Sequence, residues 1–432
     1  EARWDAADWR EAFRTARECR RSTKLSVTSG AIPAELHGTV YKVGPGKFEA
    51  GDDAYAHWLD GDGFAFAVSF EDGAATYVSR YVATQAYRDE TAAGRVTWRT
   101  TFGTSRRGGV LANAFDLKLK NPANTGLLPR PHRGVVLALY EAGAPHALNA
   151  TTLETIGVGV DDLDGRLATG RPGALPLKLP SPWLEELLNA GDALSAHYKP
   201  CEDATVAWSW RQTPDGDDLL VTLHELDEAG NVGGVSGVLE DVAFAPHDLA
   251  VTPSSALFVT APAVVEPLLY ILGLRGPAQG VFFRSADEGT TVHVLDRRAG
   301  GTARRYNFDG GAYHPVHVAG GWDAPDGPVV LASCWPPEVV GAMASERRDI
   351  LGDWAPLLAG DFTTAAVTQL VRFDCGGAGV PRVLCDGAHL DHVKVHPSVS
   401  GHKCSFLYAS AGAAVARGDV ADESYSRAEP PQ

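Results

Sequence analysis

Short runs of Val, Thr, Leu and aromatic residues, separated by Gly, Asp and Pro, recur along most of this chain. Such runs are typical of β-strands joined by tight turns. Helical periodicity is confined to the N-terminus and to a few loops, such as residues 181–191. Many strands without intervening helices predict an all-β sandwich, barrel or propeller, and no repeated blade motif selects among the three.

The chain has 432 residues, 44% of them hydrophobic, so it can bury a large core. Since no Pro-, Ser- or Gly-rich linker divides it, we expect one large domain over residues 24–415. Trp4, Trp9 and Phe13 stand at near-helical spacing, which predicts an amphipathic helix or leader over residues 1–23. Residues 416–432 read as a polar tail.

The formal net charge of −16 repels phosphate backbones and argues against a nucleic-acid partner. The six cysteines form no C-x-x-C pair, so reduced, mostly buried thiols are expected. No apolar run reaches the ~18–20 residues that span a bilayer. The chain begins at Glu1, which leaves open whether a targeting peptide precedes it.

Histidines are the most informative residues for chemistry, because imidazole is the commonest metal ligand in proteins. Three of the 14 histidines lie in short apolar, strand-like settings: His197, His247 and His314. Their separations of 50 and 67 residues suit one ligand from each of several successive blades. Spacing alone leaves two readings open, a metal site or three unrelated core or loop histidines.

Several segments carry a resemblance to a known family. They are Gly30–Thr39 (GAIPAELHGT), Tyr41–Gly46 (YKVGPG), His57–Gly63 (HWLDGDG), Arg80–Thr84 (RYVAT), Asn121–Thr125 (NPANT) and Leu137–Pro145 (LALYEAGAP). In this order they resemble the motifs of carotenoid cleavage oxygenases, and the match runs from about Lys24 to Ala411. The resemblance implies a seven-bladed β-propeller with a short N-terminal helix, helical loops on its top face and a catalytic iron(II) held by histidines.

The resemblance also gives roles to residues. By position in the family motifs, His197, His247 and His314 are the expected iron ligands. His317 takes the place of a family asparagine and is a rival for the third position, but the motif favours His314. Glu141 and Asp391 match carboxylates that hydrogen-bond ligand histidines, although Asp391 is one methylene shorter than the family glutamate.

The family's fourth ligand histidine is not found, so we expect an incomplete or degenerate member whose propeller need not close. Surface or strand-edge positions are expected for the four histidines near the C-terminus, His389, His392, His396 and His402. His57, beside Asp60 and Asp62, is expected to brace a tight turn.

The resemblance implies an iron(II) dioxygenase that uses dioxygen to cleave a conjugated double bond of a carotenoid or apocarotenoid into two carbonyl products. The alternatives are a non-catalytic propeller that binds an apolar ligand and an iron-dependent isomerase of the retinoid type. An apolar polyene substrate predicts peripheral membrane contact at a tunnel entrance formed by Leu268, Leu269, Tyr270, Ile271 and Leu272. A second apolar patch comprises Trp183, Leu184, Leu187 and Leu188. An intracellular location, in the cytoplasm or a plastid, is expected, and the oligomeric state and the bond cleaved stay open.

Overall fold

The computed structural model describes Trp9 and residues 11–168, 173–202, 204–348, 359, 366–377, 379–385, 390–411, 414–419 and 424–427. Within these residues the fold is built mainly of strands, as the sequence predicts.

Six sheets of four or more strands follow one another along the described part of the chain. The first two are β1 (Cys19–Lys24), β6 (Ala74–Tyr81), β5 (Asp62–Glu71) and β2 (Gly38–Lys47), then β10 (Thr155–Val158), β9 (His146–Asn149), β8 (Val135–Leu139) and β7 (Gly126–Arg130). The third joins β11 (Ala193–Leu194), β12 (Lys199–Cys201), β13 (Ala204–Gln212), β14 (Leu219–Asp227), β15 (Val232–Gly233), β16 (Ser236–Leu239) and β22 (Gly301–Thr302).

The fourth sheet contains β17 (Ala250–Val251), β18 (Ser255–Thr260), β21 (Thr290–Asp296) and β23 (Arg304–Phe308). The fifth contains β24 (His314–Trp322), β25 (Val329–Trp335), β26 (Gln369–Asp374) and β27 (Arg382–Cys385), and the sixth β28 (Leu390–Lys394), β29 (Phe406–Ala411), β30 (Ala414–Asp419) and β31 (Ser424–Arg427). Two short pairs complete the set, β3 (Glu49–Ala50) with β4 (Asp53–Ala54) and β19 (Ala263–Val265) with β20 (Val281–Phe283).

Local sequence explains these hairpins. In the first sheet, β5 and β6 are joined by Asp72–Gly73, and both turn residues have positive φ (47° and 70°). An Asp-Gly pair is the favoured two-residue hairpin turn, because its twist matches that of the strands. Strand β8 lies between β9 and β7 in the second sheet, and all five of its residues are buried, so this strand is covered on both faces.

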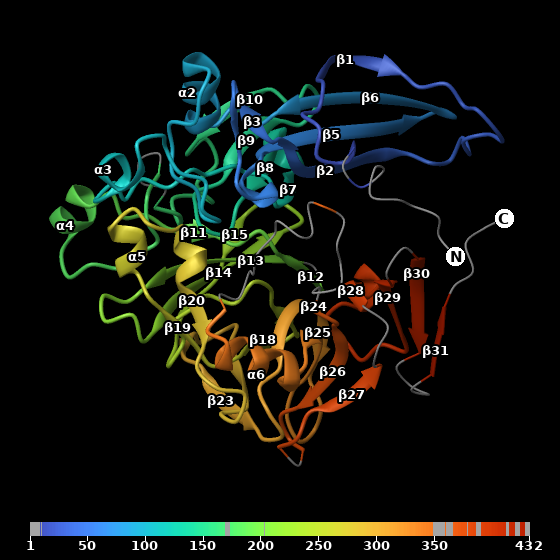
Figure 1. Ribbon diagram of the computed structural model, residues 1–432. Coiled ribbons are helices and arrows are strands. Elements are labelled where there is room, and N and C mark those ends of the chain that lie inside the picture. Colours follow the sequence, from blue (N-terminus) through green and yellow to red (C-terminus); the bar gives the residue numbers. More distant parts are fainter. Residues whose placement is uncertain are drawn as a thin grey trace.

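The sheets are arranged in sequence order around a centre, which the colours of Figure 1 follow from blue to red. One strand of each sheet lies against a strand of the next: β12 against β17, β17 against β24, and β24 against β28. Each large core cluster is shared by neighbouring sheets; one packs Leu257 of β18 against Val330 of β25 and Val371 of β26. This is the packing of propeller blades. The number of blades and the closure of the ring stay predictions.

Two boundary predictions need correction. The expected N-terminal helix cannot extend to residue 23, because Cys19–Lys24 forms β1 and pairs with β6. Residues 1–8 and 10 lie outside the described part of the chain. The segment expected to be a polar tail contains strand β31 and most of β30; β30 pairs with β29, and β31 pairs with β30. Backbone pairing with a neighbouring strand decides both segments, and side-chain polarity does not reveal it.

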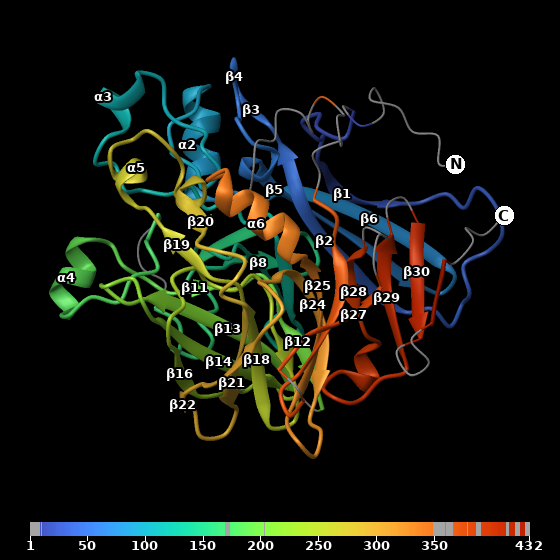
Figure 2. The same cartoon turned by 60° about the horizontal axis from the view of Figure 1, so that its bottom comes forward.

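The described helices are short. They are α2 (Gln85–Ala93), α3 (Gly109–Asn113), α4 (Pro182–Leu187), α5 (Leu268–Ile271) and α6 (Pro337–Ser345), with 3₁₀ turns η1 (Trp58–Asp60), η2 (Pro131–Arg133), η3 (Pro277–Gly280) and η4 (Pro397–Val399). Helices α2 to α5 lie on the same side of the molecule in both views (Figures 1 and 2). Within the described residues, no helix has both the length and the apolar character needed to cross a membrane.

Candidate metal centre

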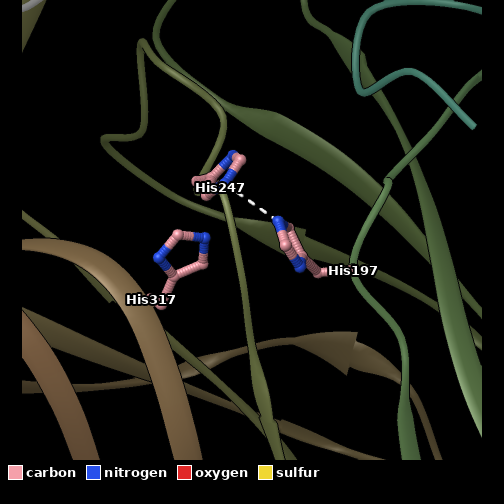
Figure 3. Close-up of side chains that lie close together, drawn as sticks. All are labelled: His197, His247 and His317. Carbon is pink, nitrogen blue, oxygen red and sulfur yellow. Dashed lines mark hydrogen bonds between the residues drawn. The ribbon is translucent and has the colours of Figure 1, made fainter. Parts of the chain in front are cut away.

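Three imidazoles converge near the starts of strands β12, β17 and β24, which belong to three consecutive sheets. His197 lies two residues before β12, His247 three residues before β17, and His317 within β24. One ring nitrogen of each lies within 4.8 Å of the others. The Nε2 atoms of His197 and His247 are 2.9 Å apart, and the ring of His317 faces both (Figure 3). The ring centroids of His317 lie 5.2 Å from His197 and 5.1 Å from His247.

Two carboxylates orient two of these rings. Nδ1 of His247 lies 2.5 Å from Oε2 of Glu141, which follows β8. Nδ1 of His317 lies 2.6 Å from Oδ1 of Asp391 in β28. A carboxylate accepts a hydrogen bond from Nδ1–H, which leaves the Nε2 lone pair directed at the shared point. Both carboxylates that the resemblance singled out are therefore beside a histidine of this cluster.

The electrostatics of the cluster favour a cation. Burial would raise the pKa of Glu141, but His247 outweighs it and holds that pKa below its ordinary value. Burial opposes a raised pKa for His247, but Glu141 prevails and raises it. Burial lowers the pKa of His197 well below its ordinary value, so this imidazole stays neutral. Two carboxylates behind three imidazoles supply negative charge that a divalent ion would balance.

The donor set fits a metal ion. With metal–nitrogen bonds of about 2.1 Å, two Nε2 atoms this close would bind one ion at roughly a right angle. Imidazole is a ligand that suits iron, zinc, copper and nickel, so the donors alone do not select the metal. His197, His247 and His317 are the residues that could hold it.

The structure places His314 differently from the sequence prediction. Its ring lies 5.0 Å from that of Phe283 and 5.3 Å from that of Trp335, outside the cluster. Burial, with a smaller effect of nearby His247, lowers its pKa to about 3. His314 and His317 pair with Trp335 and Ser333 of β25, two positions apart. Two positions span roughly 7 Å of strand, so the two side chains cannot replace each other at one ion.

The histidines near the C-terminus are outside the triad where the structure describes them. His392 comes nearest: it is exposed, and its ring lies 4.7 Å from that of His317. Nδ1 of His396 accepts a hydrogen bond from the backbone of Ser398 at the start of η4, and His402 is exposed. His389 falls outside the described residues.

His57 has the structural role that was expected. Its Nδ1 accepts a hydrogen bond from the Leu59 N–H at 3.1 Å, and its ring stacks on Phe102 at 4.6 Å. Asp60 in the same turn accepts bonds from the Phe102 N–H (3.0 Å) and the Thr104 hydroxyl (2.7 Å). The segment is a braced turn.

An apolar surface lies over α3 and α5. Of the five residues predicted to form a tunnel entrance, Leu268 is 60% exposed, Tyr270 is buried, and Leu269, Ile271 and Leu272 are partly buried. Sequence reasoning missed the more exposed members Leu111 (99%) and Phe115. The Phe115 N–H donates to the Ile271 carbonyl at 2.7 Å, which joins the two loops. We call Leu111, Phe115, Leu268 and Leu274 the apolar rim.

The second predicted patch is also partly exposed. Trp183, Leu187 and Leu188 of the α4 region are exposed and Leu184 is partly buried. The chain pattern that could have revealed the rim is Val110–Leu111 followed by Phe115, apolar residues in a loop otherwise rich in Gly and Arg.

Known proteins resemble this chain in sequence and in fold. Residues 12–425 match the family model described as retinal pigment epithelial membrane protein. Apocarotenoid-15,15'-oxygenase of Synechocystis sp. is 33% identical over 388 residues, 88% of this chain and 72% of that protein. Isoeugenol monooxygenase of Pseudomonas nitroreducens is 27% identical over 68% of this chain and 54% of that protein. The crystal structure of cobalt-substituted Synechocystis ACO superposes with a TM-score of 0.80 at 27% identity, over 98% of this chain and 84% of that one.

Proposed function

Since the chain belongs to the family of carotenoid cleavage oxygenases and the retinal pigment epithelial membrane protein, we propose that it is a non-haem iron(II) dioxygenase. The reaction would cleave a conjugated double bond of a carotenoid or apocarotenoid into two carbonyl products. The observation that carries the proposal is the convergence of His197, His247 and His317, two of them backed by carboxylates. His197 and His247 lie just before strands β12 and β17, and His317 lies within β24, so three of the chain's sheets position these residues.

In this proposal His197, His247 and His317 hold the iron, and Glu141 and Asp391 keep two of the rings in the tautomer that presents Nε2. When bound, iron(II) would supply the activation of dioxygen beside the alkene. No ligand of the triad is a carboxylate, so the bound ion would keep its 2+ charge. A related structure with cobalt in place of its metal supports a divalent ion in the same fold.

The surroundings of His314 suit an apolar substrate. Phe283 and Trp335 flank its ring, and its lowered pKa of about 3 keeps it uncharged at neutral pH. The apolar core around Phe283 also contains Val281, Val340 and Met343. Uncharged rings beside the metal centre would exclude water and contact a polyene chain. We therefore assign His314 to the lining of the substrate path, next to the ligands.

A polyene dissolves in membranes, so the substrate must be taken from an apolar phase. The apolar rim supplies a surface that would enter the outer part of a bilayer without spanning it. Burying a Leu or Phe side chain contributes roughly 1.5–3 kcal/mol, so a few such residues give reversible attachment. Peripheral membrane contact through this rim is part of the proposal.

The substrate class follows from the relative named apocarotenoid-15,15'-oxygenase, which is the more similar of the two relatives described above. The relative named isoeugenol monooxygenase makes a shorter phenylpropene a second substrate candidate. An apocarotenoid and a phenylpropene each contain an alkene conjugated to a π-system, so the same oxidative cleavage at the same site would act on either substrate. Product analysis distinguishes them.

The test is to load the full chain with iron(II) without oxygen, measure iron per chain, and then add an apocarotenal and air. We expect one iron per chain, oxygen-dependent bleaching and two carbonyl products. The metal-free protein is the control. If the chain takes up iron and cleaves neither a polyene nor a phenylpropene, but forms a geometric isomer of the substrate, the isomerase alternative is favoured. A chain that takes up no iron would be the non-catalytic alternative.

A further inference from the structure

A buried lysine and aspartate lie directly behind the metal centre, and each is close in sequence to one of its histidines. Lys199 follows His197 by two residues, and Asp248 follows His247 directly. Their side chains are 8% and 2% exposed. The third member of the group is the backbone of Val318, which directly follows His317. Each of the three segments that carry His197, His247 and His317 therefore contributes one residue to this group.

The contacts close a triangle. Lys199 Nζ lies 2.9 Å from Oδ2 of Asp248 and donates to the Val318 carbonyl at 2.7 Å. The Val318 N–H donates to the same Oδ2 of Asp248 at 2.8 Å. The other Asp248 oxygen accepts the Leu249 N–H at 2.8 Å. Three chain segments, 49 and 70 residues apart, are thus joined pairwise by short bonds.

Fold stability alone is a weak reason for such a group. A buried ion pair loses much of its solvation, and well-packed apolar residues in its place are often as stable or more so. What apolar residues cannot supply is directional bonding that fixes three backbones relative to one another.

We propose that Lys199 and Asp248 are positioning residues of the metal centre, which hold the segments of His197, His247 and His317 at the separation that one ion requires. This inference rests on the proposed function, since it assumes that the three histidines bind a metal. The residues do not contact the ion. They act by preorganising the ligands, so their loss would lower metal affinity and change the ligand geometry.

The chain contains a matched control for general destabilisation. Lys120 is also buried, and its Nζ lies 2.9 Å from both Asp62 and Glu90 and donates to the Tyr55 hydroxyl at 2.8 Å. None of these partners belongs to a histidine-bearing segment of the centre. Replacing Lys120 leaves buried carboxylates unpaired, as replacing Lys199 does, without touching the triangle.

The experiment measures Co(II) affinity and the Co(II) absorption spectrum of the full chain for wild type, Lys199→Met, Asp248→Asn and Lys120→Met. We expect Co(II) affinity to fall about 10–100-fold in Lys199→Met, the range typical of lost supports behind metal ligands. Asp248→Asn keeps an acceptor for the Val318 N–H, so its Co(II) affinity should fall less. The Co(II) absorption spectra of Lys199→Met and Asp248→Asn should both differ from that of the wild type. Lys120→Met should have wild-type affinity and spectrum despite a lower Tm.

Unchanged affinity and spectrum in both Lys199→Met and Asp248→Asn would overturn the proposal. An equal loss in Lys120→Met would also overturn it, because the effect would then be general destabilisation. If Lys199→Met does not fold, Asp248→Asn decides by the same comparison. Failure of the wild-type chain to bind Co(II) is a separate outcome, which refutes the metal centre and with it the proposed function.

Discussion

Nδ1 of His317 lies 2.6 Å from Oδ1 of Asp391, although the two residues are 74 positions apart. This contact accounts for the short side chain at position 391, because β28 runs directly beside β24 and brings the aspartate within reach. It also changes which residue completes the triad. The histidine that the carboxylate orients is His317, and His314 faces Phe283 and Trp335.

We predict that His317→Ala lowers metal affinity by more than the 10–100-fold typical of a lost supporting residue, because a ligand itself is removed. His314→Ala should keep wild-type affinity, since its ring lies outside the cluster. Isothermal titration with Co(II) measures both. A large loss in His314→Ala with none in His317→Ala would restore the assignment made from sequence.

Glu141→Gln and Asp391→Asn should each lower metal affinity by about 10–100-fold, because an amide is a weaker acceptor for Nδ1–H and can present its NH₂ group instead. Metal competition with a chelator measures the change. Asp391→Glu is the conservative control for the second site and should keep more affinity than the asparagine variant. Equal affinity in wild type and both amide variants would show that these carboxylates do not support the ligands.

Buried histidines outside the centre predict sensitivity to acid. Burial, with a smaller effect of Arg166, lowers the pKa of His224 to about 4, and its Nε2 lies 2.9 Å from the Ser209 hydroxyl. The unfolded chain takes up the proton near pH 6.5, so the folded state loses stability as pH falls from there towards 4. One such proton contributes a slope of about 1.4 kcal/mol per pH unit.

His224→Gln should therefore reduce the slope of unfolding free energy against pH by about one proton between pH 6 and 4.5. Urea unfolding at a series of pH values measures it. Ser209→Ala is the control, because it removes the hydrogen-bond partner and keeps the titrating group. An unchanged slope in His224→Gln would mean that this imidazole is not held neutral by burial.

The apolar rim predicts a membrane phenotype separable from metal binding. Replacing Leu111, Phe115 and Leu268 with Ser should reduce binding to phosphatidylcholine vesicles at least 10-fold. Burial of each of these side chains in the bilayer would contribute roughly 1.5–3 kcal/mol to the binding free energy. Val380→Ser, an exposed apolar residue elsewhere, is the control. Vesicle co-sedimentation and iron content are the two measurements. Wild-type vesicle binding in the triple variant would exclude the rim as the contact surface.

The strand-rich fold could be predicted because local sequence patterns indicate it: short apolar runs and turn pairs such as Asp72–Gly73. Where long-range pairing decides, prediction failed: Cys19–Lys24 has a helix-like sequence context but pairs with β6. A pairing partner more than 50 residues away leaves no local signal. Strand β31 was missed for a different reason: it pairs with the adjacent strand β30, but its polar sequence resembles that of a tail.

The candidate site divides in the same way. His197 and His247 could be identified because short motifs surround them, and the structure brings them together. His317 was ranked second because the motif spacing favours His314, whereas an irregular register between Pro315 and His317 shifts the strand by a residue. The pairing of Lys199 with Asp248 could not be predicted from sequence, because the residues are 49 positions apart and no local motif around either one indicates its partner.

The most direct test is anomalous diffraction at the iron edge from crystals of the iron-loaded full chain. The account predicts one strong peak about 2.1 Å from the Nε2 atoms of His197, His247 and His317. His314 should remain between Phe283 and Trp335. A peak bound by His314 instead of His317, or no peak at this cluster in crystals that contain iron, would contradict it.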